Sequence, residues 1–324
     1  MSADSNKEEE EVGEVILRCA SCGTTESDDK GIDDIKLRKC SACHLVRYCG
    51  VNCQKEHRPK HKKECKKRAA ELHDELIFKQ PESSHFGNCP ICLIPLSLDE
   101  TKSVMMGCCS TMICDGCNYA NKTRELEGGL QQSCAFCRNP SPTSRIEVDK
   151  LRMKRIEAKD PVALRKAGTQ RYGEGDYKDA FDYWIKAAEL GDTVAHYLLS
   201  CVYNGGLGNS WGVEKDEKKE VYHLEQAAIA GHTIARHNLG VHEAESGRYE
   251  RARRHFIINA NLGEDVSMKE LKSMYQGGLV SKEDFASTLR AHKAAVDAMK
   301  SPQREAAEAD AKYCEFRQSC QNRS

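Results

Sequence analysis

The residues of this chain best suited to chemistry are cysteines whose spacing is typical of metal ligands. The chain has 324 residues and 18 cysteines, and 15 of these lie between Cys19 and Cys137. Several form Cys-x2-Cys pairs, which bring two thiolates onto one tetrahedral ion through a tight turn. The first residues are acidic and lack the apolar segment of a secretory signal, so we expect reduced thiols that bind metal rather than disulfides.

The first cluster contains enough ligands for two closed tetrahedral zinc sites. Its candidates are Cys19, Cys22, Cys40, Cys43, Cys49, Cys53, His61 and Cys65. The last two pairs have i,i+4 spacing, which places both ligands of a pair on one face of a helix. His57 is either an alternative ligand or, as we prefer, a solvent-facing helix residue, because the site is complete without it.

Residues 19 to 65 resemble the MYND zinc finger in the order and spacing of CASC, CSAC, RYCGVNCQ and HKKEC. Ligand pairs interleave in that family. The resemblance implies one zinc ion held by Cys19, Cys22, Cys49 and Cys53, and a second held by Cys40, Cys43, His61 and Cys65. Arg58 stands where the family usually has a tryptophan, so this chain departs from the family at a position that bears on peptide binding.

The second cluster again supplies ligands for two zinc ions. Its candidates are Cys89, Cys92, Cys108, Cys109, Cys114, Cys117, Cys134 and Cys137. The segments CPIC, CCSTMICDGC and CAFCR resemble the all-cysteine variant of the RING finger. The cross-braced pattern of that family implies one site from Cys89, Cys92, Cys114 and Cys117, and another from Cys108, Cys109, Cys134 and Cys137.

Cys108 and Cys109 depart from the RING pattern because they are adjacent, whereas that variant separates the pair by one residue. Either both bind the metal with local strain, or one is a buried thiol beside the site.

A RING finger contributes no nucleophile and no general base. The resemblance implies a ubiquitin ligase that orients a charged ubiquitin-conjugating enzyme for attack by a lysine. Ile91, between the first ligand pair, would contact that enzyme, and Arg138 matches the arginine that hydrogen-bonds ubiquitin and the enzyme together. Ala135 stands where many active ligases have proline, which weighs against activity.

Small residues recur through the second half of the chain. Ala163, Ala195, Ala235 and Ser267 are separated by 32, 40 and 32 residues. Small side chains let paired helices pack closely, and the glycines of AAELGD, AAIAGH and NANLGED predict left-handed helix ends. Residues 161 to about 296 resemble Sel-like tetratricopeptide-type repeats, which offer a groove to protein segments. We expect the recurring aromatic residues to pack in the core: Tyr172, Tyr183, Trp184, Tyr197, Tyr203 and Tyr222.

The sequence therefore predicts a multidomain chain, in which two small zinc-stabilised domains (a MYND finger and a cross-braced RING) precede an all-α helical-repeat solenoid. The predicted segments are a disordered acidic N-terminus (1–15), the MYND-type finger (16–68), a linker helix (69–84), the RING-type finger (85–140), a second linker helix (141–160), the repeats (161–300) and a tail (301–324).

The composition limits the kinds of partner that this chain is expected to bind. The formal net charge is -1, so no overall field favours nucleic acid, although residues 55–68 form a basic run that leaves this reading open as a weaker one. We expect no membrane span, no small-molecule substrate and a soluble cytoplasmic or nuclear protein.

Two functions remain: a RING-type ubiquitin ligase that recruits substrate through the repeats, or a non-catalytic scaffold that binds proteins through its modules. Both require about four zinc ions per chain.

Overall fold

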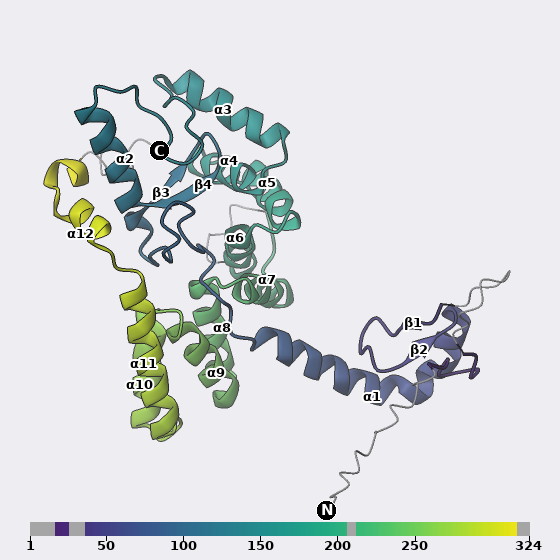
Figure 1. Cartoon of the computed structure of the whole chain (residues 1–324). Helices are drawn as coiled ribbons and strands as arrows, with labels where there is room; N and C mark the ends of the chain where they lie inside the picture. The colour runs from purple at the N-terminus through teal and green to yellow at the C-terminus, as the bar shows by residue number, and fades with distance from the viewer. Residues whose placement is uncertain (1–16, 26–35, 206–211, 316–324) are drawn as a thin grey trace, which may run out of the picture. The chain divides into compact units, whose positions relative to one another are not determined.

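The computed structural model describes residues 17–25, 36–205 and 212–315. Its contacts divide the chain into two compact units, residues 1–77 and 78–324, which Figure 1 shows coloured along the sequence. The predictions for the acidic N-terminus (1–15) and for the last part of the tail lie outside the described residues. Within the described ranges, none of the helices is both long and apolar enough to cross a membrane.

In the first unit, two short strands and one long helix surround a core made largely of cysteines. β1 (Arg38–Lys39) pairs antiparallel with β2 (Arg47–Tyr48), and α1 (Val51–Ile77) follows. The buried side chains are Cys19, Leu37, Cys40, Cys43 and Tyr48. Burial of one large apolar side chain contributes only about 2 kcal/mol, whereas ordering the backbone opposes folding by about 1–2 kcal/mol per residue. This unit therefore needs a further source of stability.

The second unit begins with a hairpin and a helix. β3 (Ser103–Met106) pairs antiparallel with β4 (Thr111–Cys114), and α2 (Asp115–Glu127) starts directly after β4. A short 3-10 helix, η1 (Glu100–Lys102), precedes the hairpin. Half of the buried core residues here are again cysteines: Cys89, Leu96, Ile113, Cys114, Cys117 and Ala135.

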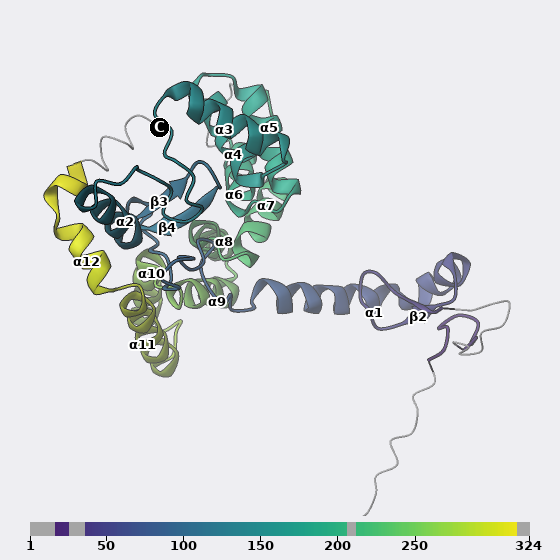
Figure 2. The same cartoon turned by 45° about the horizontal axis from the view of Figure 1, so that its top comes forward.

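The rest of the second unit is a row of helices, each packed on the next along the chain (Figures 1 and 2). After α3 (Arg145–Glu157) come α4 (Pro161–Gly173), α5 (Tyr177–Glu189), α6 (Thr193–Asn204), α7 (Glu217–Ile229), α8 (Thr233–Glu245), α9 (Tyr249–Ala260), α10 (Asp265–Gln276) and α11 (Lys282–Ala298). α12 (Pro302–Ala309) leaves this row and packs on α2. The predicted order of zinc-binding modules followed by a helical-repeat solenoid is thus confirmed.

Every repeat starts with the same local device, a left-handed residue followed by a side-chain cap. The left-handed residues are Lys159, Gly191, Gly231 and Gly263. The caps that follow are Asp160, Asp192, His232 and Glu264, and each accepts a hydrogen bond of 2.6–3.2 Å from the backbone N–H of the aligned small residue. A cap of this kind stabilises a helix by about 1 kcal/mol. The left-handed residue sets the angle between helices, and the cap fixes where the next helix begins.

The aromatic residues expected to pack in the core do not all do so. Trp184 and Tyr203 are buried, but Tyr222 is 52% exposed and Tyr172 is 37% exposed. Helical spacing alone places a residue on a face of its helix, whereas burial also depends on which neighbouring helix covers that face. Tyr222 lies on α7, where it meets the ring of His196 edge-on at 6.4 Å.

Two glycines on α4 distinguish close helix packing from open surface. A Cβ at Gly168 would lie 2.6 Å from Cδ1 of Trp184, whereas nothing lies within 4 Å of a Cβ at Gly173. We expect Gly168→Ala to destabilise the solenoid by about 1–3 kcal/mol through overpacking. Gly173→Ala should instead stabilise it by up to about 1 kcal/mol, because alanine favours helix. Urea unfolding followed by circular dichroism measures both, and equal effects would contradict the close contact.

One of the caps is a histidine that must stay neutral. His232 accepts the hydrogen bond of Ala235 through Nδ1, and its ring stacks between His85 (4.2 Å between centroids) and Tyr197 (4.6 Å). Burial lowers the pKa of His232 to about 3 and that of His85 to about 4. Both rings are therefore uncharged in the folded solenoid near neutral pH.

Acidification should weaken the solenoid for this reason. Because the folded-state pKa lies below the unfolded value of about 6.5, this stability is fully present above pH 6.5 and declines as the pH falls towards 3. Between pH 7 and pH 5 we expect a loss of roughly 2 kcal/mol for each such histidine. His232→Asn keeps a capping side chain that does not titrate, and should remove one histidine's share. Urea unfolding at both pH values, with zinc content recorded, tests this, and an unchanged pH dependence would refute it.

Candidate metal centres

The described residues contain four groups of potential metal ligands, and within each group the ligand atoms all lie within 4.8 Å of one another. The first two groups are Cys19, Cys22, Cys49 and Cys53, and Cys40, Cys43, His61 and Cys65. The other two are Cys89, Cys92, Cys114 and Cys117, and Cys108, Cys109, Cys134 and Cys137. The structure thus brings together all sixteen predicted ligands, in the groups that the family resemblances implied.

Four ligand pairs are presented by the same backbone turn. In these four Cys-x2-Cys turns the residue after the second cysteine is left-handed, and its N–H donates to the carbonyl of the first cysteine at 2.8–3.0 Å. These residues are Gly23, His44, Leu93 and Arg138. The turn aims both Sγ atoms of the pair at the same point, which is the geometry that a tetrahedral ion requires.

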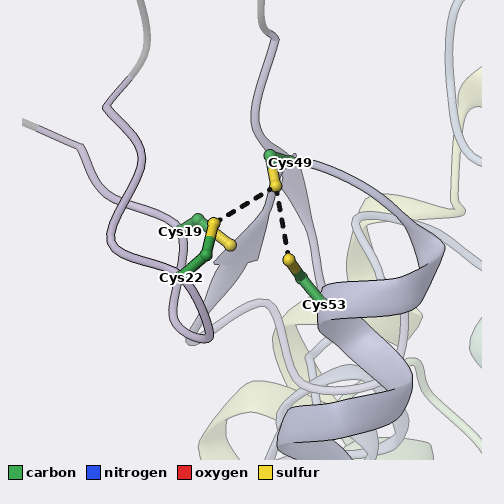
Figure 3. A group of neighbouring side chains, drawn as sticks. All are labelled: Cys19, Cys22, Cys49 and Cys53. Carbon is green, nitrogen blue, oxygen red and sulfur yellow. Dashed lines mark hydrogen bonds between the residues drawn. The ribbon is translucent and has the colours of Figure 1, made fainter.

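The first centre joins such a turn to the start of α1. Figure 3 shows Cys19 and Cys22 on their loop, Cys49 just after β2, and Cys53 on the first turn of α1. The Sγ atom of Cys49 lies 3.5 Å from the Sγ atoms of both Cys22 and Cys53. Cys49 therefore precedes α1, although the i,i+4 spacing predicted both ligands of this pair on one helix face, and the two thiols still meet because the chain turns directly into the helix.

The second centre contains the single histidine ligand. His61 Nε2 lies 3.1 Å from Cys43 Sγ, and Cys40 Sγ lies 3.8 Å from Cys65 Sγ. His57 is not in this group. Its ring stacks on that of His61, with Nδ1 3.1 Å from the hydroxyl of Tyr48. His57 therefore supports the ligand helix and is neither a ligand nor an isolated surface residue.

The third centre uses the junction between β4 and α2. Cys114 ends the strand, and its Sγ accepts a hydrogen bond from the N–H of Cys117, so that it also caps α2. Cys92 Sγ lies 3.8 Å from Cys114 Sγ, and Cys89 is fully buried. Strand, helix start and loop turn thus converge on one point.

The fourth centre includes both of the adjacent cysteines. Cys108 and Cys109 occupy the turn between β3 and β4, where Cys109 N–H donates to the Met106 carbonyl at 3.2 Å. Cys108 Sγ lies 3.3 Å from Cys137 Sγ, and Cys109 Sγ lies 4.0 Å from Cys134 Sγ. The tight turn directs both thiols to the same group, and the following Ser110 takes a left-handed conformation (φ 53°).

These separations suit zinc. Four thiolates at a Zn–S distance of about 2.3 Å in a tetrahedron lie about 3.8 Å apart. The ligands of each centre come from separate segments of the chain, yet the Sγ–Sγ distances given above are only 3.3–4.0 Å. Cysteine and histidine are also the donors that zinc prefers. The ligand groups therefore fit multiple zinc sites.

The electrostatics of the third centre explain why a cation belongs there. A hydrogen bond from Cys114 lowers the pKa of the Cys89 thiol to about 4. The same interaction raises the pKa of Cys114, and burial raises that of Cys117 to about 12. Thiols this close cannot all ionise alone because their negative charges repel. A divalent ion removes the repulsion and keeps all four deprotonated.

A polar network holds the fourth centre against α2. Glu125 is buried, and its carboxylate accepts hydrogen bonds from Ser133 (2.7 Å) and Asn121 (2.9 Å). Burial by itself would raise the pKa of Glu125, but these hydrogen bonds lower it below its usual value. Arg138 Nη1 donates to Asn121 Oδ1 at 2.9 Å. The turn that carries Cys134 and Cys137 is therefore fixed on both sides.

The residues predicted to contact partners lie on the two turns of this second zinc module (residues 89–138). Ile91 is 42% exposed and Leu93 is 72% exposed on one turn, and Phe136 is 45% exposed on the other. Ala135 is buried in the core. Ile91 and Arg138 were predicted from the sequence as partner contacts, whereas the exposure of Leu93 and Phe136 inside or beside Cys-x2-Cys turns emerges from the structure.

The basic run on α1 is partly neutralised by its own helix. Arg68 forms ion pairs with Glu71 (3.2 Å) and Glu75 (2.8 Å), and Lys67 lies 4.0 Å from Glu71. Acidic side chains one and two turns away thus offset the end of the run, which favours a solvated helix face over a phosphate-binding stripe.

Arg304, which the sequence did not indicate, lies against the third centre. Its Nη2 donates to Cys92 Sγ at 3.8 Å. Burial by itself would lower the pKa of Arg304, but the neighbouring thiolates of Cys114 and Cys92 raise it above its usual value. No motif could have revealed this contact, because 212 residues separate Arg304 from Cys92.

Comparison with known proteins supports part of this description. The family model of the MYND finger matches residues 19–65, which is the segment that forms the first two centres. MYND fingers are protein-interaction modules. No curated protein matches the chain significantly.

Among solved structures, the chain is similar to a Sel1 repeat protein from Oxalobacter formigenes, with 19% identity and a TM-score of 0.40 over 64% of this chain and 86% of that one. It is also similar to a protective antigen of uropathogenic Escherichia coli with an SLR fold, with 19% identity and a TM-score of 0.38 over 54% of this chain and 36% of that one.

The metal content follows from the ligand groups. We expect native mass spectrometry to find about four zinc ions on the intact chain, at four ligands per ion. Cys108→Ser and Cys109→Ser should each reduce this to about three, because each removes a ligand of the fourth centre. Cys201→Ser removes a solenoid thiol and should keep the full count. Three ions on the unaltered chain, or no change in the Cys109 variant, would contradict the fourth centre.

Proposed function

We propose that this chain is a zinc-stabilised protein-interaction protein, and that its sixteen cysteine and histidine ligands bind four zinc ions. We further propose that the MYND-type finger (16–68), the second zinc module within 85–140 and the repeats (161–300) act as separate binding modules. The metal-ligand turns and the row of helices from α3 to α11 would provide the surfaces that bind protein partners. Among the described residues, the tightly clustered cysteines are all explained as metal ligands, and we assign no nucleophile to them.

The second zinc module is proposed to be a RING-type domain that recruits a ubiquitin-conjugating enzyme. The observation that carries this proposal is the exposure of apolar side chains on two turns of the module. Ile91 and Leu93 lie on one turn, and Phe136 lies on the other. Apolar side chains held on a rigid frame lose little entropy on binding, which favours binding of a protein partner at this surface. The first turn carries two ligands of the third centre, and the second turn carries two ligands of the fourth centre.

Catalysis by such a domain is orientation. The ligase holds the conjugating enzyme and its ubiquitin thioester in a reactive arrangement, and a substrate lysine amine then attacks the thioester carbonyl. An amide bond to ubiquitin forms, the thioester C–S bond breaks, and the cysteine thiol of the conjugating enzyme leaves. Arg138 follows the last ligand and is exposed, so its remaining guanidinium N–H groups can reach a bound protein while Asn121 holds Nη1. The repeats would bring the substrate.

A non-catalytic scaffold is the second candidate, and a specific observation favours it. The Arg138 guanidinium already donates to Asn121, and this contact must persist or rearrange when a partner binds. Ala135 is buried, so it adds no apolar surface between the turns. In this case the modules bind proteins without transfer of ubiquitin.

Ubiquitin transfer separates the two candidates. The zinc-loaded full chain is incubated with activating enzyme, ubiquitin and a panel of conjugating enzymes, and autoubiquitination is followed on gels. We expect Ile91→Ala and Arg138→Ala each to reduce the rate roughly tenfold, as removal of an anchoring contact does. Zinc content must remain that of the unaltered chain in both variants.

Matched substitutions elsewhere provide the controls. Ile234→Ala removes an isoleucine that is 49% exposed on α8, and Arg290→Ala removes an exposed arginine on α11, and neither should change the rate. Absence of transfer with every conjugating enzyme, while the chain still binds protein partners, would reject the ligase and leave the scaffold.

A further inference from the structure

The segment that follows the solenoid returns to the second zinc module. α12 lies along α2 in both views of Figures 1 and 2. Asn118 Nδ2 donates to the hydroxyl of Tyr313 at 2.9 Å, and the hydroxyl of Tyr119 donates to Asp310 at 3.1 Å. These contacts join residues almost two hundred positions apart in sequence. We call residues 301–313 the return segment.

Arg304 is the most deeply placed residue of the return segment that carries a charge. It is 9% exposed. Its Nη1 donates to the carbonyls of Pro95 (2.7 Å) and Met299 (2.6 Å), and its Nη2 donates to the Ile94 carbonyl (3.2 Å) as well as to Cys92 Sγ. Ile94 and Pro95 follow directly after the turn that carries Cys89 and Cys92. The guanidinium therefore braces the turn that presents two ligands of the third centre.

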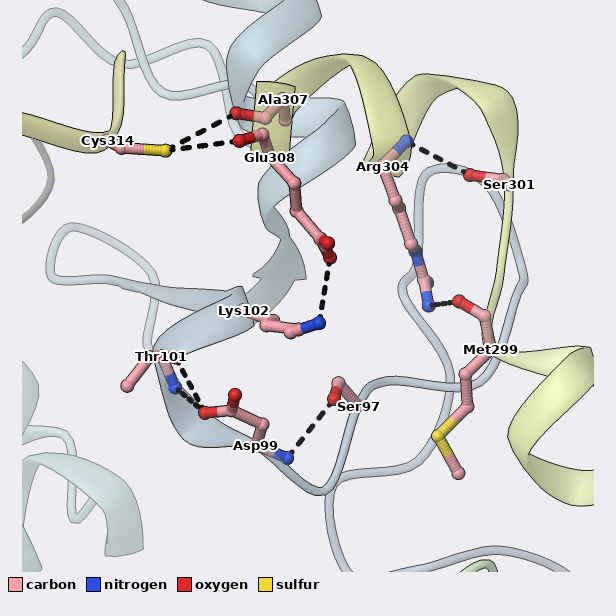
Figure 4. A network of polar contacts seen from close by, with 10 residues as sticks. All are labelled: Ser97, Asp99, Thr101, Lys102, Met299, Ser301, Arg304, Ala307, Glu308 and Cys314. Carbon is pink, nitrogen blue, oxygen red and sulfur yellow. Dashed lines mark hydrogen bonds and ion pairs between the residues drawn. The ribbon is translucent and has the colours of Figure 1, made fainter. Parts of the chain in front are cut away.

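Figure 4 shows how the return segment places this side chain. Ser301 caps α12 by accepting the N–H of Arg304, and the Arg304 side chain extends back towards Met299 and the zinc turn. Glu308 lies 3.0 Å from Lys102, one turn further along. A helix cap and an ion pair thus fix the backbone from which Arg304 projects.

The helix α2 is shaped for this approach. A Cβ at Gly116 would lie 2.9 Å from the backbone nitrogen of Arg304 and 2.9 Å from the carbonyl carbon of Gln303, so only glycine allows the two backbones to come this close. Gly116 sits between the ligands Cys114 and Cys117. The side chain of Gln303 also reaches the centre, with Oε1 3.8 Å from Cys117 Sγ. The third centre is therefore covered by the return segment on the α2 side.

Charge explains why an arginine belongs here. Four thiolates around one divalent zinc carry a net charge of about -2, and the Cys89 and Cys114 side chains are almost fully buried. Buried charge is unfavourable unless it is paired and hydrogen-bonded. A guanidinium at the edge of the centre offsets part of this charge and donates to a ligand sulfur, and such outer contacts tune how firmly a metal is held.

We propose that the return segment is a structural part of the third zinc centre, and that Arg304 is the positioning residue that sets how tightly its zinc ion is retained. The proposal does not depend on ubiquitin transfer. It assigns to a segment at the far end of the solenoid a role in metal binding by Cys89, Cys92, Cys114 and Cys117.

Zinc release from the intact chain tests the proposal. The zinc-loaded full chain is mixed with excess chelator, release is followed by absorbance, and exposed thiols are alkylated at intervals and located by mass spectrometry. We expect Arg304→Met, which keeps the apolar stem, to release one zinc ion about tenfold faster. Alkylation should then appear first on Cys89, Cys92, Cys114 and Cys117. Arg304→Gln should resemble Arg304→Met, and Arg304→Lys should lie closer to the unaltered chain.

A second variant tests the role of the return segment without a change at Arg304. Gly116→Ala improves the helix propensity of α2 but displaces the return segment, so it should also speed release from the third centre. Lys312→Met is the control, because it removes an exposed positive charge from the same segment and should leave the rate unchanged.

Three outcomes would overturn the proposal. Unchanged release from Arg304→Met would make the return segment a docked helix without influence on the metal. Equal acceleration at Cys108, Cys109, Cys134 and Cys137 would indicate general loosening of the module. Release from Arg304→Lys as fast as from Arg304→Met would exclude charge as the cause.

Discussion

The meeting of distant cysteines at single points is the constraint on which the first half of the chain depends. In both zinc modules the ligand pairs alternate between two centres, so each centre joins two pairs that are separated in the sequence by a pair of the other centre. The apolar cores are small and consist largely of the ligands themselves. Metal coordination thus replaces the hydrophobic core that segments of this length cannot build, and folding and zinc binding become one equilibrium.

The solenoid solves a different problem with a repeated local device, and its two ends support the second zinc module. At its start, Asp160 caps α4 and also pairs with Arg155, which donates to the Cys109 carbonyl at 3.3 Å beside the fourth centre. Beyond its end, Arg304 braces the third centre. In between, His85 N–H donates to the carbonyl of Gly231 at 3.0 Å. The module is therefore held by the solenoid at several separate points.

Local signals in the sequence were sufficient for the ligands and for the repeats. The Cys-x2-Cys and i,i+4 spacings identified the ligand pairs, because a tight turn or one helical turn leaves few alternatives, whereas the family resemblances implied which pairs share an ion. The glycines before the last three repeats likewise indicated the left-handed residue, whereas Lys159 at the first repeat was not foreseen. His232 as a cap was not apparent either, because histidine is not a usual capping residue. Contacts of Arg304 and of exposed Tyr222 depend on which helices meet, and no periodicity encodes that.

The return segment is synthesised long after the zinc module that it contacts. Arg304 is added 212 residues after Cys92. At the usual pace of about 5–20 residues per second, a ribosome needs roughly 10–40 s to cover that interval. A nascent module must hold its third ion through this delay without its counter-charge, exposed to competing thiols and chelators in the cell. Arg304 can reach the centre only when the solenoid has been made and has turned back, so the third ion is held at full strength only after the intervening helices have folded.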